Sequence, residues 1–431
     1  MSRHNVAYFH DDTIGNFCYG QAHPMKPHRV AMTHNLVVNY KMDEQMDVFV
    51  PYRALDAEMT AFHSKEYIRF LKEVSPGNKD IYRSEQMKFS VGEDCPIFEG
   101  LFEFCQIYTG GSIQGARRLN TRQCEIAINW AGGLHHAHKA EAAGFCYVND
   151  IVLAILELMK HHSRVLYIDI DIHHGDGVEE AFNLCNRVMT VSFHKYGPKG
   201  GDMFFPGTGD VTDIGQQEGA GYAVNFPLKD GVTDEQYSER IFKPIIGSVV
   251  ETFKPAAIVL QCGADSLAGD RLGCFNITSL CHGSCVEFVK SFGLPLLVLG
   301  GGGYTISSVA RCWTYETACL LGADISLGHI PENEYSDYFA PDHALFVGAA
   351  SGMENQNSHA YVERNKNKIL DHLRSIQGAP STQLKEVRHL IFLFLFWVRL
   401  QVELWSLQMP MDALLKEEEE RLAAGEEDDS R

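Results

Sequence analysis

The segment RVLYIDIDIHHGDG, residues 164–177, decides the fold prediction because it joins an apolar run to a cluster of ionisable side chains. Its β-branched and aliphatic start is typical of a buried strand in a parallel sheet. If residues 167–173 are extended, Asp169, Asp171 and His173 share one face and three isoleucines share the other. Crowded buried carboxylates repel one another unless a cation or hydrogen bonds compensate. The segment therefore predicts a buried strand that ends in a cation site.

Further apolar runs predict a sheet built around this strand. They occupy residues 125–130, 187–193, 222–228, 256–262 and 295–300. Stretches with helical spacing lie between several of them, at 150–162, 234–253 and 307–321. This alternation predicts an α/β fold: a single domain with a mostly parallel central sheet flanked by helices. Polar and Gly-rich residues follow four of the strands, and ligands of open α/β sheets bind at the carboxyl ends of the strands.

Composition and charge restrict the classes of function. The chain has 431 residues, 45% of them hydrophobic, and a formal net charge of −19. Such an acidic chain argues against direct, sequence-specific nucleic-acid binding and favours basic partners. The start lacks the features of a secretory signal, and the twelve cysteines form no paired framework, so we expect free thiols.

Two side chains of the opening segment and one distant aspartate predict a metal site. Carboxylate oxygens and imidazole nitrogens suit Zn²⁺, and a catalytic zinc site has three protein ligands and an open position. Asp171 and His173 supply two ligands, and Asp265, after the run AAIVLQC, is the best candidate for the third. In the alternative interpretation, Asp169 and Asp176 cap the following turn and the histidines are structural. Spacing does not distinguish Zn²⁺ from Fe²⁺.

The segment GGLHHAHKAEAAGFCYVND, residues 132–150, contains two adjacent histidines. After two glycines the backbone can turn so that both rings face one cavity. His135 and His136 are then candidates for general acid and base, because imidazole titrates near neutral pH. Asp169 and Asp176 can each orient one ring by accepting its second N–H. Packing histidines are the alternative.

The segment LGGGGYT, residues 299–305, brings four glycines next to a tyrosine. It lacks both the Lys-Ser/Thr ending of a phosphate-binding P-loop and the spacing of a dinucleotide fingerprint. We therefore expect the glycines to let the backbone approach a narrow pocket. Tyr304 can then donate a hydrogen bond to a developing oxyanion.

Together with FFPGTGD and LQCGADSL, these segments resemble a class I histone deacetylase of the arginase-deacetylase superfamily over about residues 5–382. The resemblance implies the arginase-deacetylase fold and a hydrolase that removes acetyl groups from lysine side chains of histone tails. It also implies action in chromatin-based transcriptional repression, in the nucleus and also in the cytoplasm, with corepressor complex subunits as partners. A deacetylase of small acylated amines and a catalytically idle scaffold are the alternatives.

The same resemblance implies roles for individual residues, which are assigned from the matching segments. One Zn²⁺ binds Asp171, His173 and Asp265, the protons are handled by His135 and His136 paired with Asp169 and Asp176, and Tyr304 polarises the carbonyl. The substrate tunnel and its rim comprise Asp94, Gly144, Phe145 and Phe205, and the acetate pocket comprises Met25, Arg29 and Leu134. K⁺ or Na⁺ is expected near Asp169, Asp171, His173, Ser192 and Phe193.

Two further features are expected from the resemblance or depart from it. Lys26 and Arg271 match residues that bind an inositol phosphate, but Cys18 and Ser307 replace a usual histidine and arginine.

We expect residues 1–382 to form the catalytic domain. Residues 383–431 comprise an atypical apolar segment followed by an acidic tail that we expect to be disordered. The uninterrupted apolar run there is shorter than the ~20 residues that a membrane span needs, so no membrane is expected.

Overall fold

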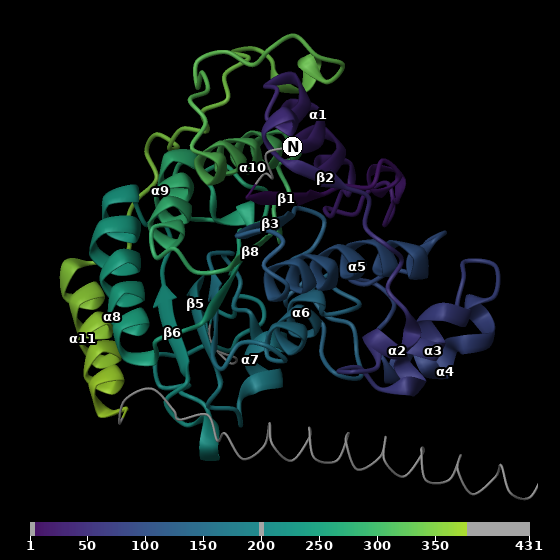
Figure 1. Ribbon diagram of the computed structural model, residues 1–431, viewed down its shortest axis with the longest axis horizontal. Helices are drawn as coiled ribbons and strands as arrows, with labels where there is room; N and C mark the ends of the chain where they lie inside the picture. The colour runs from purple at the N-terminus through teal and green to yellow at the C-terminus, as the bar shows by residue number, and fades with distance from the viewer. Residues whose placement is uncertain (1–4, 198–201, 377–431) are drawn as a thin grey trace, which may run out of the picture. The chain divides into compact units, whose positions relative to one another are not determined.

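A computed structural model describes residues 5–197 and 202–376 of the chain, all of which belong to one compact unit, 1–380. Its centre is an eight-stranded sheet in which every paired strand is parallel to its neighbour (Figure 1). The strand order is β2-β1-β3-β8-β7-β4-β5-β6. The strands are β1 (Val6–Phe9), β2 (Asp47–Phe49), β3 (Ile126–Asn129), β4 (Val165–Asp169), β5 (Val188–Lys195), β6 (Ala223–Leu228), β7 (Ala257–Gln261) and β8 (Leu296–Leu299). The predicted α/β architecture is confirmed, and the sheet is fully parallel.

Helices cover both faces of the sheet (Figure 1). They are α1 (His28–Asn39), α2 (Asp56–Met59), α3 (Lys65–Glu73), α4 (Arg83–Lys88), α5 (Leu101–Asn120), α6 (Asp150–Leu158), α7 (Asp176–Phe182), α8 (Lys243–Phe253), α9 (Ser279–Lys290), α10 (Ile306–Leu321) and α11 (His359–Ser375). Side chains alternate along each strand, so β4 packs Val165 and Tyr167 with residues of α5, α6 and α7. Leu166 and Ile168 point to the opposite face, in a core shared with α8, α9 and α10.

Strand β4 is shorter than the sequence predicts. β4 ends at Asp169, and residues 171–173 form a bend rather than extended backbone. The cause is local, because the Asp171 N–H donates to Asp169 Oδ1 and the His173 N–H donates to Asp171 Oδ1, both at 3.0 Å. Aspartate side chains that bond backbone two residues ahead favour a turn over a sheet ladder.

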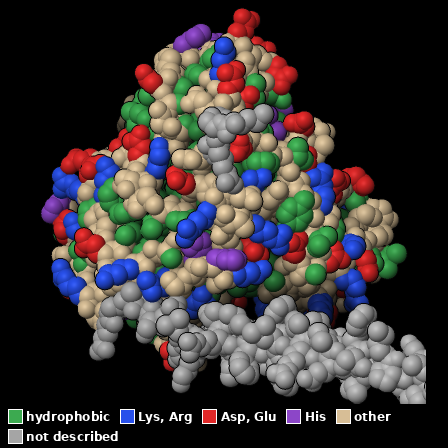
Figure 2. Space-filling model, viewed as in Figure 1, with side chains coloured by type: hydrophobic (Ala, Val, Ile, Leu, Met, Phe, Trp, Pro, Cys, Tyr) green, Lys and Arg blue, Asp and Glu red, His purple; other side chains and the backbone are tan. Residues whose placement is uncertain are grey.

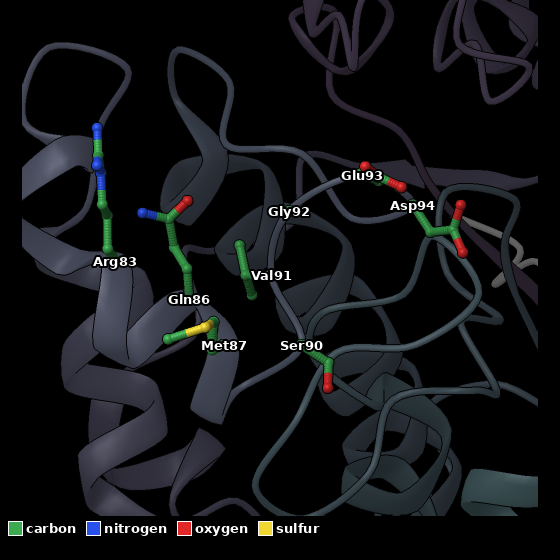
Figure 3. A pocket seen from close by; sticks show the side chains of 8 residues that line it. All are labelled: Arg83, Gln86, Met87, Ser90, Val91, Gly92, Glu93 and Asp94. Atoms are coloured by element: carbon green, nitrogen blue, oxygen red, sulfur yellow. The ribbon is translucent and has the colours of Figure 1, made fainter.

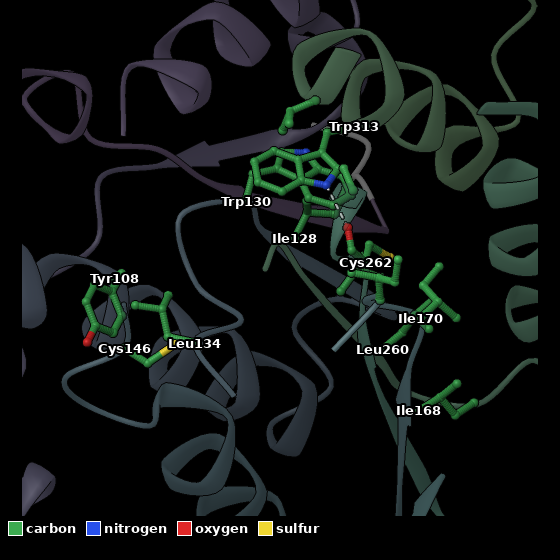
Figure 4. Packing of buried hydrophobic residues seen from close by; sticks show 14 of the residues in the cluster. Tyr108, Ile128, Trp130, Leu134, Cys146, Ile168, Ile170, Leu260, Cys262 and Trp313 are labelled. Atoms are coloured by element: carbon green, nitrogen blue, oxygen red, sulfur yellow. Dashed lines mark hydrogen bonds between the residues drawn. The ribbon is translucent and has the colours of Figure 1, made fainter. Parts of the chain in front are cut away.

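A pair of tryptophans joins the sheet to α10. Trp130, which follows β3, and Trp313 on α10 stack with ring centroids 5.4 Å apart and planes 8° apart. The Trp313 Nε1–H donates to the carbonyl oxygen of Cys262 at 2.8 Å, as the dashed line in Figure 4 marks. Both rings are fully buried. The pair therefore fixes α10 against the carboxyl ends of β3 and β7.

Within residues 5–197 and 202–376, no helix combines the length and apolar character needed to cross a bilayer. The predicted apolar segment and acidic tail of residues 383–431 lie outside the described residues.

Candidate active site

Asp171, His173 and Asp265 come together beyond the carboxyl ends of β4 and β7. One donor atom of each side chain lies within 4.8 Å of the others. His173 Nδ1 is 3.1 Å from both Asp171 Oδ1 and Asp265 Oδ2. Both aspartates are fully buried and His173 is 7% exposed. Two carboxylates and one imidazole at one buried point match the donor set of a catalytic zinc site.

Neighbouring groups hold each carboxylate in place through its other oxygen. Asp171 Oδ2 accepts from the Gly302 N–H at 2.8 Å and from Gln261 Nε2 at 2.9 Å. Asp265 Oδ1 accepts from the Ile172 N–H at 2.9 Å. Outer contacts of this kind fix the orientation of metal ligands. The remaining oxygen of each carboxylate, Asp171 Oδ1 and Asp265 Oδ2, lies 3.1 Å from His173 Nδ1.

The electrostatics of these residues also fit a cation. Burial, together with the charge of Asp171, raises the pKa of Asp265 to about 7. Burial opposes charge on His173, but hydrogen bonds to Asp171 and Asp265 outweigh it and raise the pKa of His173 to about 10. His173 thus holds a proton between two carboxylates, and a metal ion displaces such protons from its ligands when it binds.

Glycines leave room for the carboxylates. A Cβ at Gly302 would lie 2.0 Å from Asp265 Oδ2 and 2.9 Å from Asp171 Oδ2. A Cβ at Gly263 would lie 1.9 Å from Asp171 Oδ2. Because these distances are far below contact distance, a side chain at either position would displace a predicted metal ligand. The GGGG run thus lets the backbone approach the two carboxylates closely.

His135 and His136 lie side by side next to this group. Their ring centroids are 3.9 Å apart, and the turn that brings them together includes Gly133 at φ +94°. His135 Nδ1 is 2.8 Å from Asp169 Oδ2, and His136 Nδ1 is 2.7 Å from Asp176 Oδ1. Each carboxylate can accept an Nδ1–H, which leaves Nε2 for proton exchange.

The two imidazoles differ in pKa. Burial alone would lower the pKa of His135, but Asp169 and then Asp171 outweigh it and raise that pKa to about 9. Burial and the charge of His135 lower the pKa of His136 to about 3. Of the two rings, His135 is thus the one whose surroundings favour the charged form.

Tyr304 follows the glycine run and is buried. Its ring meets that of Phe145 edge-on at 5.7 Å, and its backbone N–H donates to Asp270 Oδ2 at 2.7 Å. Burial raises the pKa of the Tyr304 phenol well above its usual value. The phenol therefore keeps its proton and is able to donate a hydrogen bond.

The predicted tunnel residues flank these groups. Phe205 is 38% exposed and packs edge-on against His136, with ring centroids 4.9 Å apart. Phe145 has a left-handed φ of +68°. A Cβ at Gly144 would lie 2.4 Å from His136 Cδ2 and 2.8 Å from Phe205 Cε1, so only glycine fits between them.

Asp94 lies at the surface close to Phe145. The Asp94 carbonyl oxygen is 3.1 Å from His23 Nε2, and the His23 ring meets the Phe145 ring edge-on at 4.6 Å. Asp94 itself is exposed. The predicted rim residue is therefore linked to a predicted wall residue through one histidine.

The residues predicted for the acetate pocket are all buried: Met25, Arg29 and Leu134. Arg29 Nη1 donates to the Gly303 carbonyl at 2.6 Å, and Nη2 donates to the Gly301 carbonyl. Its guanidinium carbon lies 5.0 Å from the centre of the Trp313 ring. Arg29 thus connects α1 to the glycine run.

The residues predicted to bind monovalent cations and an inositol phosphate lie on several segments. Ser192 pairs with Asp169 in the sheet register, and Phe193 follows it on β5. Lys26 Nζ donates to the carbonyls of Gly20 and Gln21, both at 2.8 Å. Arg271 lies in the loop after Asp265 and is exposed.

Several supporting residues were not predicted. Tyr167 donates to Asp169 Oδ2 at 2.6 Å, and Gln261 holds Asp171. Ser266 Oγ lies 2.8 Å from His282 Nε2, and His282 Nδ1 lies 2.9 Å from Glu316 Oε1, in a fully buried row beneath Asp265. Gln261 lies within LQCGADSL and Tyr167 begins YIDIDI, so their closeness in sequence to predicted ligands could have identified them. His282 and Glu316 lie in no predicted motif, so no feature of the sequence identified them.

His173 and His174 are adjacent in sequence but contact different groups. His174 contacts Thr208 Oγ1 at 2.8 Å through Nδ1 and Glu179 Oε2 at 3.1 Å through Nε2. Both ring nitrogens are therefore engaged outside the group formed by Asp171, His173 and Asp265.

Comparisons with known proteins identify relatives across most of the chain. A family model described as the histone deacetylase domain matches residues 23–320. The chain is 58% identical over 386 residues to Histone deacetylase 1 of Homo sapiens, which covers 90% of this chain and 78% of that protein. Identity is 57% to Histone deacetylase HDAC1 of Drosophila melanogaster, over 90% of this chain and 73% of that one. It is 56% to Histone deacetylase 9 of Arabidopsis thaliana, over 90% and 89%.

Proposed function

This chain belongs to the histone deacetylase family, and from that premise we propose which of its residues carry out the reaction. The enzyme is a lysine deacetylase, a zinc-dependent hydrolase that removes acetyl groups from histones and so regulates chromatin. Hydrolysis consumes one water molecule and releases acetate and the free lysine amine. The observation that best supports the residue assignment is the convergence of three buried ligand side chains next to two carboxylate-paired histidines.

Asp171, His173 and Asp265 hold the Zn²⁺. When bound, the ion supplies Lewis-acid activation of the acetyl carbonyl and of water. Tyr304 donates a hydrogen bond to the oxygen that becomes negatively charged, an interaction typically worth about 3–4 kcal/mol. Its buried, protonated phenol supports this role.

His135 and His136 move the protons. One imidazole takes a proton from the attacking water, and an imidazolium delivers a proton to the leaving amine. Asp169 and Asp176 hold the two rings by their Nδ1 atoms, at 2.8 and 2.7 Å. Their role is to position the histidines.

The substrate lysine enters between Phe145 and Phe205, with Gly144 allowing the close approach of wall and histidine. Asp94 at the rim holds the peptide backbone. Acetate leaves through the pocket of Met25, Arg29 and Leu134. Arg29 Nε has no hydrogen-bonding partner among the described residues, which leaves it available to an acetate oxygen.

We propose further ligands and partners on the basis of the resemblance to this family. K⁺ or Na⁺ binds near Asp169, Asp171, His173, Ser192 and Phe193, and an inositol phosphate binds Lys26 and Arg271. Corepressor subunits bring the enzyme to chromatin, and it works in the nucleus and also in the cytoplasm. Residues 1–382 form the catalytic domain.

The replacement of an arginine by Ser307 removes one bidentate phosphate contact, so we expect weaker inositol phosphate binding than in relatives that keep the arginine.

The assignment is tested with the full-length protein and a peptide of a histone tail that contains acetyl-lysine. We expect turnover that is lost on treatment with a chelator and restored by added Zn²⁺. Absence of turnover in purified, metal-loaded protein, even with a corepressor fragment and inositol phosphate present, would establish an idle scaffold instead. A preference for small acetylated amines over the peptide would establish the other alternative.

A further inference from the structure

A surface cleft of about 610 Å³ adjoins the tunnel rim. One side is formed by α4 and the other by the loop that follows it, up to Asp94 (Figure 3). In Figure 3, Arg83 lies at one end, Glu93 and Asp94 lie at the other, and Gln86 and Met87 lie between them. None of the catalytic side chains lines this cleft.

The cleft is continuous with the proposed active site. Asp94 belongs both to the cleft and to the rim, and its carbonyl oxygen is 3.1 Å from His23 Nε2. His23 in turn packs edge-on against Phe145, with ring centroids 4.6 Å apart. A peptide whose acetyl-lysine passes Phe145 would therefore emerge close to Asp94, which also lines the cleft.

The cleft is held in shape before any peptide binds. Its loop is anchored by buried side chains of Phe89, Val91 and Cys95. The Val91 N–H donates to the Gln86 carbonyl at 3.0 Å, and the Gly92 N–H donates to the Cys95 carbonyl at 3.0 Å. A preformed surface loses little conformational entropy on binding, which favours affinity.

The chemistry of the lining indicates its occupant. Glu93 and Asp94 are exposed carboxylates at the end next to the tunnel, and Met87, 81% exposed, offers an apolar surface in the middle. Arg83 at the far end pairs with Asp80 at 3.0 Å, but both side chains are 78% exposed. Such a pair contributes little and leaves Arg83 available. The cleft thus matches an extended basic peptide whose positive side chains lie near the acetyl-lysine.

We propose that this cleft binds the peptide segment on one side of the acetyl-lysine and selects substrates by sequence. Glu93 pairs with a basic side chain near the acetyl-lysine, and Met87 packs against an aliphatic stretch farther along. The inference rests on the proposed function, since it needs the acetyl-lysine to enter past Phe145. The occupant is the substrate itself, a basic protein tail.

The test compares full-length, metal-loaded protein with Glu93→Gln, Met87→Ala and Glu99→Gln variants. Glu99 is an exposed carboxylate that does not line the cleft, so Glu99→Gln is the matched control. Substrates are acetyl-lysine blocked at both ends and acetylated hexapeptides with lysine or glutamine at each flanking position. The readout is the ratio of kcat/KM between the basic and the uncharged peptide, and between the hexapeptide and blocked acetyl-lysine.

We expect wild type to prefer basic residues on one side of the acetyl-lysine. Glu93→Gln lowers that preference about two- to fivefold, the effect of one exposed ion pair. Met87→Ala lowers the ratio of hexapeptide to blocked acetyl-lysine, and Glu99→Gln leaves both ratios unchanged.

Each other outcome counts against the inference. Ratios that are unchanged in Glu93→Gln and Met87→Ala would assign the cleft to another partner, while turnover of blocked acetyl-lysine would leave the proposed function intact. An equal loss in Glu99→Gln would indicate a general effect of surface charge. Absent turnover of every substrate by wild type would overturn the proposed function and this inference together.

Discussion

Tyr304 combines a buried phenol with a fixed backbone. Because burial keeps the phenol protonated, the hydroxyl is the group that a phenylalanine would remove without changing the ring packing on Phe145. We expect Tyr304→Phe to lower kcat about 10²- to 10³-fold with little change in KM, the loss typical of one oxyanion donor. Steady-state kinetics check this, with metal content measured as a control. Full activity would refute the role.

His138 gives the protein a pH-dependent stability. Its Nδ1 lies 2.6 Å from Glu180 Oε2 and its Nε2 lies 3.5 Å from Asp176 Oδ2. Hydrogen bonds to Asp176 and then Glu180 raise the pKa of His138 to about 10. The folded pKa thus exceeds the unfolded value of about 6.5. The stabilisation is fully present below about pH 6.5 and is lost as the pH rises through about 10.

We therefore expect wild type to lose more stability than a His138→Gln variant between pH 6.5 and pH 10. Urea unfolding midpoints at several pH values across that window measure the difference. Parallel curves for the two proteins would contradict the linkage. Glu180 is the more exposed partner, with 64% of its side chain accessible, so added salt should reduce the difference.

Residue types close together in sequence predicted much of the site. The D-x-D-x-H spacing and the HH pair indicated side chains that the structure brings together, because those residues share one short segment each. Gln261 and the row of Ser266, His282 and Glu316 were not predicted as supports. Their contacts depend on how β7, α9 and α10 pack, which no local spacing encodes.

Among the elements, the glycine run after β8 leaves the space that the proposed metal ligands occupy. A methyl group at Gly302 would overlap the facing carboxylate oxygens of Asp171 and Asp265. We expect Gly302→Ala to abolish tight zinc binding and activity. Zinc content after gel filtration measures the loss.

The matched control is Gly247→Ala in α8, where an added Cβ meets nothing within 4 Å. Because alanine favours a helix over glycine by about 1 kcal/mol, this variant should retain zinc and unfold at a slightly higher urea concentration. Equal zinc content in both variants would contradict the steric argument.

Strand prediction succeeded where apolar runs are long and failed at the edge. β1 and the three-residue edge strand β2 were not predicted. β3 and β8 also have only four residues, but they lie in longer apolar runs. The run at residues 164–172 was predicted to be a strand, but aspartate side chains end β4 at Asp169. The predicted helix at 234–253 begins with a π-helical segment, Glu235–Phe242, before α8. Sequence periodicity does not distinguish a π-helix from an α-helix.

At the scale of the whole molecule, charge affects how substrate arrives. The chain carries a net −19, and Figure 2 shows acidic and basic side chains interspersed on one face of the described unit. A net negative enzyme attracts a basic histone tail, and salt screens that attraction. We expect kcat/KM for a basic acetylated peptide to fall with added salt more steeply than for an uncharged peptide. Equal salt dependence for the two peptides would contradict this steering.

The stack of Trp130 and Trp313 has an optical consequence. The two buried indoles, with ring centroids 5.4 Å apart, are held in one rigid environment, so their near-ultraviolet circular dichroism should change when their packing changes. Trp313 also lies under the Arg29 guanidinium, which places this chromophore pair beside the proposed acetate exit. The spectrum therefore offers a label-free signal for the moment when α10 separates from the sheet, and for whether acetate binding disturbs that contact.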